Sequence, residues 1–403
     1  MKRNDLFVLE KLHDAYCLIP TGQAVADHKP SVFVNEAGAF LWNALSNDVE
    51  LAELIRLSLC KYKETDEETL KTDVTEFINA LRVREMIIDD TSVNSQAFQP
   101  QTLSGTPARQ INNTSFVHTN IIIAGLKMQF IGEPKLLNDK LMSFASDFDE
   151  PDMKITLLPC VSVANGQEKI LIKNDIALIV ETENSYKLTY KDFQKVSEIQ
   201  ISKDYKQTTI HYRSELNEDL IREIYLSVRT PLALMAREHD MLLVHSASVL
   251  FNDFLYLFSA PAGTGKSTHA ALWKETIGAP TINGDLNLCA VTSDNNVLVY
   301  GTPWCGTSEI YSTKTYPLGG IFFLKRAEID KINELSKDEK IIRLMERVIT
   351  PGWTTEMTKK NLEIAKEIAS RSLLATLECT KNIGAFETIR DYLNNIISVL
   401  PLI

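Results

Sequence analysis

Hydrophobic positions along the chain change their spacing several times, and these changes divide it into segments. Over residues 1–90, short apolar runs at 7–9, 16–19 and 31–34 are typical of strands. Three runs with helical spacing follow them. The first comes after Asn35, which can cap a helix, the second covers 51–59, and the third runs from about Asp66 to Leu81. We expect these elements to form one domain over residues 1–90.

Residues 91–113 have almost no apolar periodicity. Ser, Thr, Gln, Asn, Pro and Gly dominate this stretch, which predicts a flexible linker. A flexible chain of this length spans roughly 25 Å root-mean-square. Such a linker would let two domains act on one ligand.

The remainder, residues 114–403, begins with strand patterns at 120–126, 154–158, 176–180 and 207–212. Residues 217–239 then have a helical pattern, in which Pro231 predicts a kink. An apolar run at 242–250, a turn at Asn252-Asp253 and a second apolar run at 254–258 come next. The fold class expected for the whole chain is therefore α+β / α/β, with a β-rich segment leading into the C-terminal domain.

Residues 259–268, Ser-Ala-Pro-Ala-Gly-Thr-Gly-Lys-Ser-Thr, have the form of a phosphate-binding loop. A surface turn is the alternative, but an apolar strand pattern precedes the loop and good helix formers follow it, which favours an anion at a helix N-terminus. His269, just inside that helix, is expected to be a packing or surface residue. The residues expected to hold phosphate are Ala262, Gly263, Thr264, Gly265, Lys266, Ser267 and Thr268, with Ser267 also a candidate Mg²⁺ ligand.

Composition and charge narrow the classes of protein. The hydrophobic fraction of 44% and the charged fraction of 24% are ordinary for a globular protein, and the net charge of −11 argues against a nucleic-acid or membrane-surface partner. The chain shows no apolar stretch of transmembrane length and no apolar signal core. Its six cysteines are scattered without a Cys-x-x-Cys pair, which fits reduced thiols. We expect a cytoplasmic protein.

The N-terminal segment resembles the PqqD family of peptide-binding winged-helix domains. The matching residues are Val34 to Trp42, Asp73 to Phe77 and Met86 to Ile88. The resemblance implies that the leader of a ribosomally made precursor peptide adds as a strand to an edge and packs on the third helix. A winged-helix DNA reader is the alternative, but acidic residues crowd that helix. The implied binding residues are Ser31, Val32, Phe33 and Val34 at the edge, with Asp73, Phe77 and Arg84 along the groove.

The C-terminal part resembles the HPr kinase family and its relatives, which share their loop with phosphoenolpyruvate carboxykinases. The likeness covers roughly residues 115–400 and is strongest from 244–248 through the loop to 282–285, with a further match at 300–306 and 317–324. It implies an ATP-dependent, Mg²⁺-requiring kinase with His245 on the strand before the loop and Asp285 as the acid. The family usually has a second acid directly after the first, and this chain has Leu286 there.

That departure leaves the division of roles open. In the implied mechanism, one acid is the base for the acceptor hydroxyl and the other helps to hold Mg²⁺, so Asp285 would be a base, a metal ligand or a structural turn acid. By position alone, Asp253, Glu309 and Asn287 are candidates for the missing partner. His245 could orient the acceptor or the γ-phosphate, or simply pack in the core.

Five further residues are ambiguous from the sequence. Cys305 could be a nucleophile, although loop packing is the favoured interpretation. Arg343 and Arg347, at i and i+4, could clamp phosphate, although a solvated basic face is favoured. Lys325 and Arg326 follow the apolar run that ends at Leu324, and they are equally ambiguous.

These patterns favour a peptide kinase with two domains, in which the first captures the leader and the second phosphorylates a Ser or Thr hydroxyl. A peptide chaperone with a degenerate nucleotide domain is the main alternative, and a kinase of a small molecule or carrier protein is a third. The expected partners are the leader and a downstream maturation enzyme. Relatives in the HPr kinase family often form oligomers, so the resemblance leaves a homo-oligomer open.

Overall fold

The computed structural model describes residues 1–89, 117–159, 168–213 and 215–399, so the predicted linker at 91–113 lies outside the described residues. By its internal contacts the chain divides into two units. The first comprises Met1–Pro107 with Gly352–Glu356, and the second comprises Ala108–Pro351 with Met357–Ile403. Both helices and strands occur in each unit, which confirms the expected mixed fold class.

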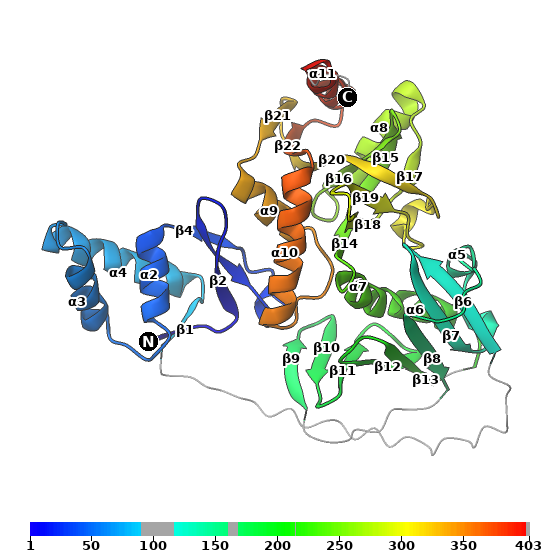
Figure 1. Ribbon diagram of the computed structural model, residues 1–403, viewed down its shortest axis with the longest axis horizontal. Helices are drawn as coiled ribbons and strands as arrows, with labels where there is room; N and C mark the ends of the chain where they lie inside the picture. The colour runs from blue at the N-terminus through cyan, green and yellow to red at the C-terminus, as the bar shows by residue number, and fades with distance from the viewer. Residues whose placement is uncertain (90–116, 160–167, 214, 400–403) are drawn as a thin grey trace. The chain divides into compact units, whose positions relative to one another are not determined.

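The first unit combines a three-stranded antiparallel sheet, in the order β2-β3-β4, with three longer helices and a β1–β5 pair (Figure 1). The predicted strands and helices are confirmed. The single-turn helix α1 was not predicted, because one turn carries no periodicity. The elements are β1 (Lys2–Arg3), β2 (Phe7–Lys11), β3 (Tyr16–Pro20), α1 (Gln23–Ala26), β4 (Val32–Val34), α2 (Glu36–Ala44), α3 (Leu51–Lys61), α4 (Glu67–Val83) and β5 (Ile87–Ile88).

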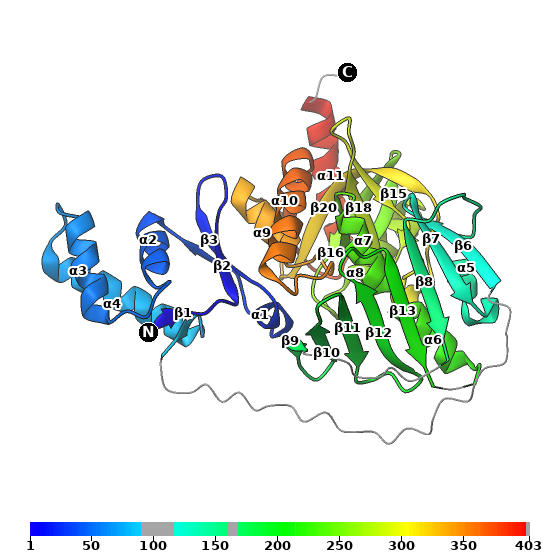
Figure 2. The ribbon, with the colours of Figure 1, turned by 60° about the horizontal axis from the view of Figure 1, so that its bottom comes forward.

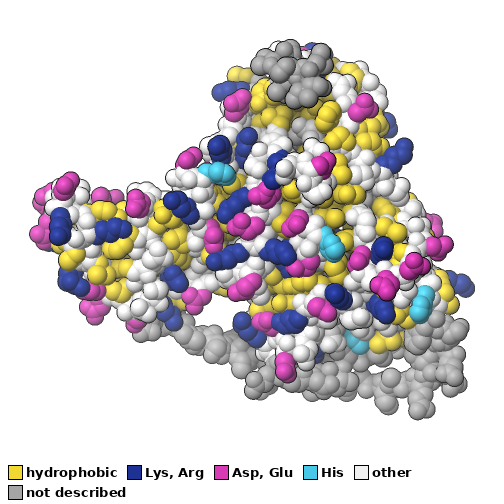
Figure 3. Space-filling view, in the orientation of Figure 1, with side chains coloured by type: hydrophobic (Ala, Val, Ile, Leu, Met, Phe, Trp, Pro, Cys, Tyr) yellow, Lys and Arg dark blue, Asp and Glu magenta, His cyan; other side chains and the backbone are white. Residues whose placement is uncertain are grey.

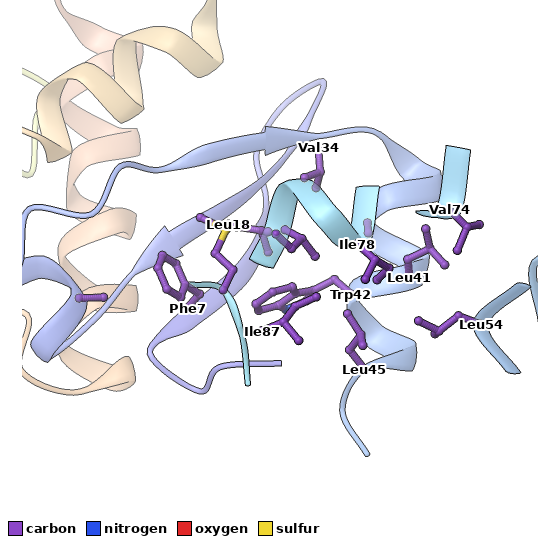
Figure 4. Close-up of a cluster of buried hydrophobic side chains, with 14 of the residues drawn as sticks. Phe7, Leu18, Val34, Leu41, Trp42, Leu45, Leu54, Val74, Ile78 and Ile87 are labelled. Atoms are coloured by element: carbon purple, nitrogen blue, oxygen red, sulfur yellow. The ribbon is translucent and has the colours of Figure 1, made fainter. Parts of the chain in front are cut away.

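Two side-chain caps fix where the helices of this unit begin. The Asn35 side chain accepts a hydrogen bond from the Gly38 N–H at 2.8 Å, and Asp66 accepts one from the Thr69 N–H at 3.0 Å. Each cap satisfies an N–H that the first helical turn cannot pair internally. The apolar faces of α2, α3 and α4 then close over the sheet around Trp42, which is 1% exposed (Figure 4).

The second unit contains an eight-stranded mixed sheet in the order β6-β7-β8-β13-β12-β11-β10-β9 (Figure 2). The β-rich segment expected before the phosphate loop is thereby confirmed, and its strands β8 and β13 pair in parallel. Its elements are β6 (Val117–Ile123), β7 (Leu126–Gly132), a 3-10 turn (Pro134–Leu136), α5 (Asp139–Met142), β8 (Met153–Leu158), β9 (Lys169–Lys173), β10 (Ala177–Glu181), β11 (Ser185–Tyr190), β12 (Val196–Ser202) and β13 (Gln207–Tyr212).

A second, nine-stranded sheet carries the predicted phosphate loop. Strands run in the order β14-β18-β19-β20-β16-β15-β17, and β22, with β21, joins β20. The elements are α6 (Glu218–Ser227), α7 (Arg229–Arg237), β14 (Met241–His245), β15 (Ala247–Phe251), β16 (Phe254–Ser259), α8 (Lys266–Ile277), β17 (Thr281–Asn283), β18 (Leu286–Val291), β19 (Val297–Tyr300), a 3-10 turn (Gly306–Ser308), β20 (Thr315–Arg326), β21 (Lys331–Glu334), α9 (Lys337–Met345), α10 (Thr355–Arg371), β22 (Leu374–Cys379) and α11 (Gly384–Val399).

The helix predicted over 217–239 is two helices, and the break is not at Pro231. It falls at Val228, which ends α6 and precedes α7. Pro231 sits in the first turn of α7, where its missing N–H would have had no helical partner. The proline is therefore tolerated inside the second helix instead of bending a single long one.

Three strands of the second sheet, β16, β20 and β22, are parallel neighbours. Their carboxyl ends therefore meet at one edge, where ligands bind in open sheets of this kind. Beneath that edge, Phe258 of β16 and Phe322 of β20 pack with Trp273 of α8, all three less than 2% exposed. This core holds the strand before the loop and the helix after it in fixed positions.

Candidate functional site

The loop at 260–265 joins the end of β16 to the start of α8, as the sequence predicts. Gly263 and Gly265 have φ angles of 74° and 123°, which side chains with a Cβ rarely adopt. Gly265 caps α8 without a side-chain hydrogen bond. The unpaired N–H groups at the start of this 12-residue helix, together with the helix dipole, are an arrangement that favours an anion there. Ala262, Gly263, Ser267 and Thr268 are exposed on it.

Lys266 is the buried cation of this loop. Its side chain is largely enclosed, and Nζ donates a hydrogen bond to the Ala260 carbonyl at 3.1 Å. Burial lowers the pKa of Lys266, the Asp285 carboxylate acts in the opposite direction, and the Arg347 charge adds to the lowering. The ammonium therefore lies within electrostatic reach of both Asp285 and Arg347.

His269 packs beneath the loop, in agreement with one of its two expected roles. The ring lies 4.4 Å from that of Phe258, and Nε2 accepts a hydrogen bond from the indole N–H of Trp273 at 3.3 Å. Burial lowers the pKa of His269 from 6.5 to about 4. The imidazole is thus neutral in the folded state and serves as an acceptor.

We expect the second unit to lose stability in acid because of His269. Since its pKa is lower in the folded state, the unfolded state binds the proton first. The stabilisation is complete above pH 6.5 and is lost as the pH falls towards 4. The loss amounts to roughly 3 kcal/mol. Urea unfolding between pH 7 and pH 4 should show the stability difference between wild type and His269→Gln narrowing by about that amount. If the stability difference between wild type and His269→Gln were the same at pH 7 and pH 4, the lowered pKa of His269 would be contradicted.

His245 and Asp285 form a side-chain pair close to Lys266. His245 Nε2 lies 3.2 Å from Asp285 Oδ1, and each side chain is about one-third exposed, at 31% and 30%. His245 is the last residue of β14, and Asp285 directly precedes β18. The Ser246 N–H donates to the Asp285 carbonyl at 2.8 Å. Of the two interpretations that the sequence left open for His245, the pairing with Asp285 favours a role in the site.

The side chain of Asn283 holds the backbone around Asp285. Its Oδ1 accepts hydrogen bonds from the N–H groups of Asp285 and Leu286 at 2.8 and 3.0 Å, and its amide donates to the Thr302 carbonyl at 2.9 Å. Asn283 is fully buried. On the side of Asp285 that faces Gly306, the space is so small that a Cβ on Gly306 would be 3.0 Å from the Asp285 Cβ. The Asp285 side chain is therefore tightly positioned at the sheet edge.

The three candidates for a second acid have different surroundings. Asp253 lies in the turn before β16, at the opposite end of that strand from the loop, so its candidacy by position was wrong. Glu309 pairs with Lys140 of α5 at 2.5 Å. The Asn287 amide donates to the Ser246 carbonyl at 2.7 Å, and its buried Oδ1 has no hydrogen-bond partner among the described residues.

The structure also shows the surroundings of Cys305, Lys325 and Arg326, whose roles the sequence left ambiguous. Cys305 is buried, and burial raises the pKa of its thiol, which supports loop packing. Lys325 pairs with Glu378 at 2.7 Å. Arg326 donates to the carbonyls of Gly263 and Thr264 and thereby holds the loop from the end of β20. Sequence reasoning could not find that contact, because it depends on β20 lying beside β16.

A Mg²⁺ ion fits the oxygen donors present. Mg²⁺ usually binds one or two protein oxygens together with phosphates and waters. The Ser267 hydroxyl is exposed in the first turn of α8, and the Asp285 carboxylate is partly exposed near Lys266. Across the described ranges, no group of three or more His, Cys, Asp or Glu side chains could hold a metal.

The predicted peptide edge is an open strand. Within the described part of the first unit, β4 pairs only with β3 and lies at the edge of its sheet. Phe33 points outward and is 43% exposed, while Ser31, just before the strand, and Val32 are half-buried and Val34 is buried. Of the α4 residues, Phe77 lies next to Gly38, as Val34 of β4 also does, and Asp73 is exposed. Arg84 is also exposed and donates to the Ala80 carbonyl at 3.0 Å.

The surface in Figure 3 has acidic and basic side chains interspersed and no extended basic patch on the face in view. In the part of the chain that the structure describes, no helix has both the length and the apolar character needed to cross a membrane.

Comparison with known proteins identifies a domain within the first unit. Residues 26–87 match the family model described as "Coenzyme PQQ synthesis protein D (PqqD)", so this segment is a PqqD domain. No curated protein matches the chain.

Solved structures are similar to parts of the chain, among them the following two. A structure described as "TbiB1 in Complex with the TbiA(beta) Leader Peptide" is 21% identical and covers 22% of this chain and 100% of its own, with a TM-score of 0.19. The HPr(Ser) kinase/phosphatase from Coxiella burnetii is 8% identical and covers 38% of this chain and 98% of its own, with a TM-score of 0.24.

Proposed function

We propose that this protein is an ATP-dependent kinase that captures a ribosomal precursor peptide by its leader and phosphorylates a Ser or Thr hydroxyl. The observation that carries the proposal is the His245–Asp285 pair beside Lys266, at the edge where the phosphate loop begins. A base and a buried cation next to a phosphate loop are the parts that phosphoryl transfer requires. The PqqD domain supplies the peptide-binding half of the proposal.

In the proposed reaction, the loop N–H groups and Lys266 bind the ATP phosphates, Ser267 would hold Mg²⁺, and Asp285, the single acid at this place, takes the role of the base. Mg²⁺ bound there would neutralise charge on the phosphates. The acceptor hydroxyl oxygen forms a bond to the γ-phosphorus, its proton passes to the Asp285 carboxylate, and the bond to the β–γ bridging oxygen breaks. His245 holds the Asp285 carboxylate through their 3.2 Å contact. ADP leaves with the electron pair.

The leader would bind as an added strand on the open edge of β4. Backbone hydrogen bonds of this kind supply affinity, and side-chain pockets set the register. Phe33 and Phe77 offer apolar contacts, while Asp73 and Arg84 offer charges of both signs. Because both activities belong to one chain, capture of the leader would raise the effective concentration of the core peptide to the millimolar range.

Replacing Lys266 with alanine tests the proposal. Incubation with Mg-ATP and the precursor peptide encoded beside the gene should add the mass of one phosphate to the peptide. Lys266→Ala should reduce that product at least about 100-fold, since a preorganised cation is lost from the developing charge. Lys274→Ala, an exposed lysine on the same helix, is the matched control and should leave the rate unchanged. ATP binding by the wild type without a modified peptide would overturn the kinase assignment.

A second candidate function is a non-catalytic peptide chaperone. The observation that favours it is Leu286 at the position of the usual second acid. Mg²⁺-dependent ATP turnover, measured with and without peptide, separates the two functions. A chaperone would bind the leader at an unchanged level in Lys266→Ala and show no turnover that depends on the peptide.

A further inference from the structure

Arg347 lies in a segment that runs along the outer edge of β14. The chain leaves α9 at Met345 and then runs antiparallel to the strand. The His245 N–H donates to the Arg347 carbonyl at 2.9 Å, and the Ile349 N–H donates to the Leu243 carbonyl at 2.9 Å. Val244 and Val348 form an antiparallel bridge between these two bonds. The backbone of Arg347 is thus fixed against the strand that ends in His245.

This register places Arg347 directly opposite His245. Since Val244 faces Val348, the next pair along the antiparallel bridge is His245 with Arg347. Directly opposed residues project their side chains to the same face, with Cβ atoms roughly 5 Å apart. His245 uses that face to reach Asp285 at 3.2 Å. The Arg347 side chain therefore starts beside the proposed catalytic pair.

The surroundings of Arg347 differ from those of a solvated surface arginine. Its side chain is 21% exposed, against 51% for Arg343 one helical turn earlier. Its ion pair with Glu346 is long, with 3.6 Å between Nη2 of Arg347 and Oε2 of Glu346. Burial lowers the pKa of Arg347, and its charge in turn lowers that of Lys266. Two largely enclosed cations whose charges act on each other favour an anion near them.

We propose that Arg347 binds the phosphoryl group during its transfer, from the side of His245, while Lys266 binds it from the phosphate loop. A guanidinium presents a planar fork of N–H donors that matches two phosphate oxygens, and it is not consumed in the reaction. In the step described above, charge spreads over the three equatorial oxygens of the transferring group, and Arg347 would donate hydrogen bonds to them. This inference rests on the proposed kinase function, and it replaces the solvated basic face expected from the sequence.

Arg347→Gln, Arg347→Lys and Arg343→Gln test the assignment in the full chain. Arg343 is the matched control, because it also pairs with Glu346, at 3.3 Å, yet is exposed. We expect Arg347→Gln to lower kcat at least about 100-fold while KM for ATP and ADP affinity change less than about threefold. Arg347→Lys should keep part of the activity, and Arg343→Gln should match the wild type. Equal kcat values for Arg347→Gln and Arg343→Gln would overturn the inference.

A second measurement separates failure of this inference from failure of the kinase proposal. Mg-ADP with aluminium fluoride imitates the transferring phosphoryl group and needs no peptide. The wild type should bind that complex more tightly than Mg-ADP alone, and Arg347→Gln should lose most of this preference while binding Mg-ADP normally. Normal Mg-ADP binding also shows that the variant is folded. An unchanged preference would refute the role of Arg347, whereas absence of peptide phosphorylation in the wild type would refute only the kinase proposal.

Discussion

Asp285→Asn is expected to lower the rate of peptide phosphorylation by about 10²- to 10⁴-fold, the range for loss of a positioned general base. Asparagine keeps the shape of the side chain but cannot accept the proton of the acceptor hydroxyl. The site should stay intact, because Asn283 holds the backbone of residue 285 through main-chain N–H groups. Single-turnover transfer from ATP to the peptide, followed by mass spectrometry, measures the effect.

His245→Gln is the companion variant for Asp285→Asn. It removes the ring that pairs with the carboxylate and leaves the carboxylate itself, so we expect a smaller loss of about tenfold. Titration with Mg²⁺ distinguishes the two roles of Asp285. If Asp285 acts only as a base, Asp285→Asn should need the same Mg²⁺ concentration as the wild type. If Asp285 is a metal ligand, the variant should need a higher Mg²⁺ concentration. Wild-type rates in Asp285→Asn would contradict both roles.

Phe33→Asp is expected to weaken leader binding by about 10- to 100-fold. The phenyl ring is 43% exposed on an open strand edge, so a leader strand paired with β4 would cover it. Removal of a central aromatic anchor at an interface typically has an effect of this size. Fluorescence anisotropy with a labelled leader peptide measures the affinity, and thermal unfolding should change little because the side chain already faces solvent.

Val25→Asp is the matched control for the leader site. Val25 lies in α1 of the same unit and is equally exposed, at 43%, but is not on β4. Its substitution adds the same charge and should leave the affinity within twofold of the wild type. Equal losses in both variants would show a general effect of charge on the unit, and an unchanged affinity in Phe33→Asp would place the leader elsewhere.

The sequence predicted local features well because their signals lie close together in the chain. The caps at Asn35 and Asp66 and the glycines of the predicted phosphate loop each act within a few residues. The break at Val228 was missed because Pro231 is a strong local signal that the first turn of a helix can accommodate.

The sequence predicted the position of a residue less well where that position depends on strand direction or register. Asp253 lies one strand length away from the loop, which only the direction of β16 reveals. The position of Arg347 follows from the bridge between Val244 and Val348, more than a hundred residues apart. Arg326 reaches Gly263 because β20 and β16 are parallel neighbours. Such pairings leave no trace in local spacing, so the sequence could offer these residues only as candidates.

The Lys140–Glu309 ion pair ties the β-rich segment to the loop that covers Asp285. Phe144 and Tyr311 stack beside it with ring centroids 6.4 Å apart. A fragment cut to begin at β14 would lose both Lys140 and Phe144 and leave that loop without its anchor. A graft of the proposed kinase unit onto a different recognition domain should therefore have its junction before β6, so that Lys140 and Phe144 stay with the loop that they hold.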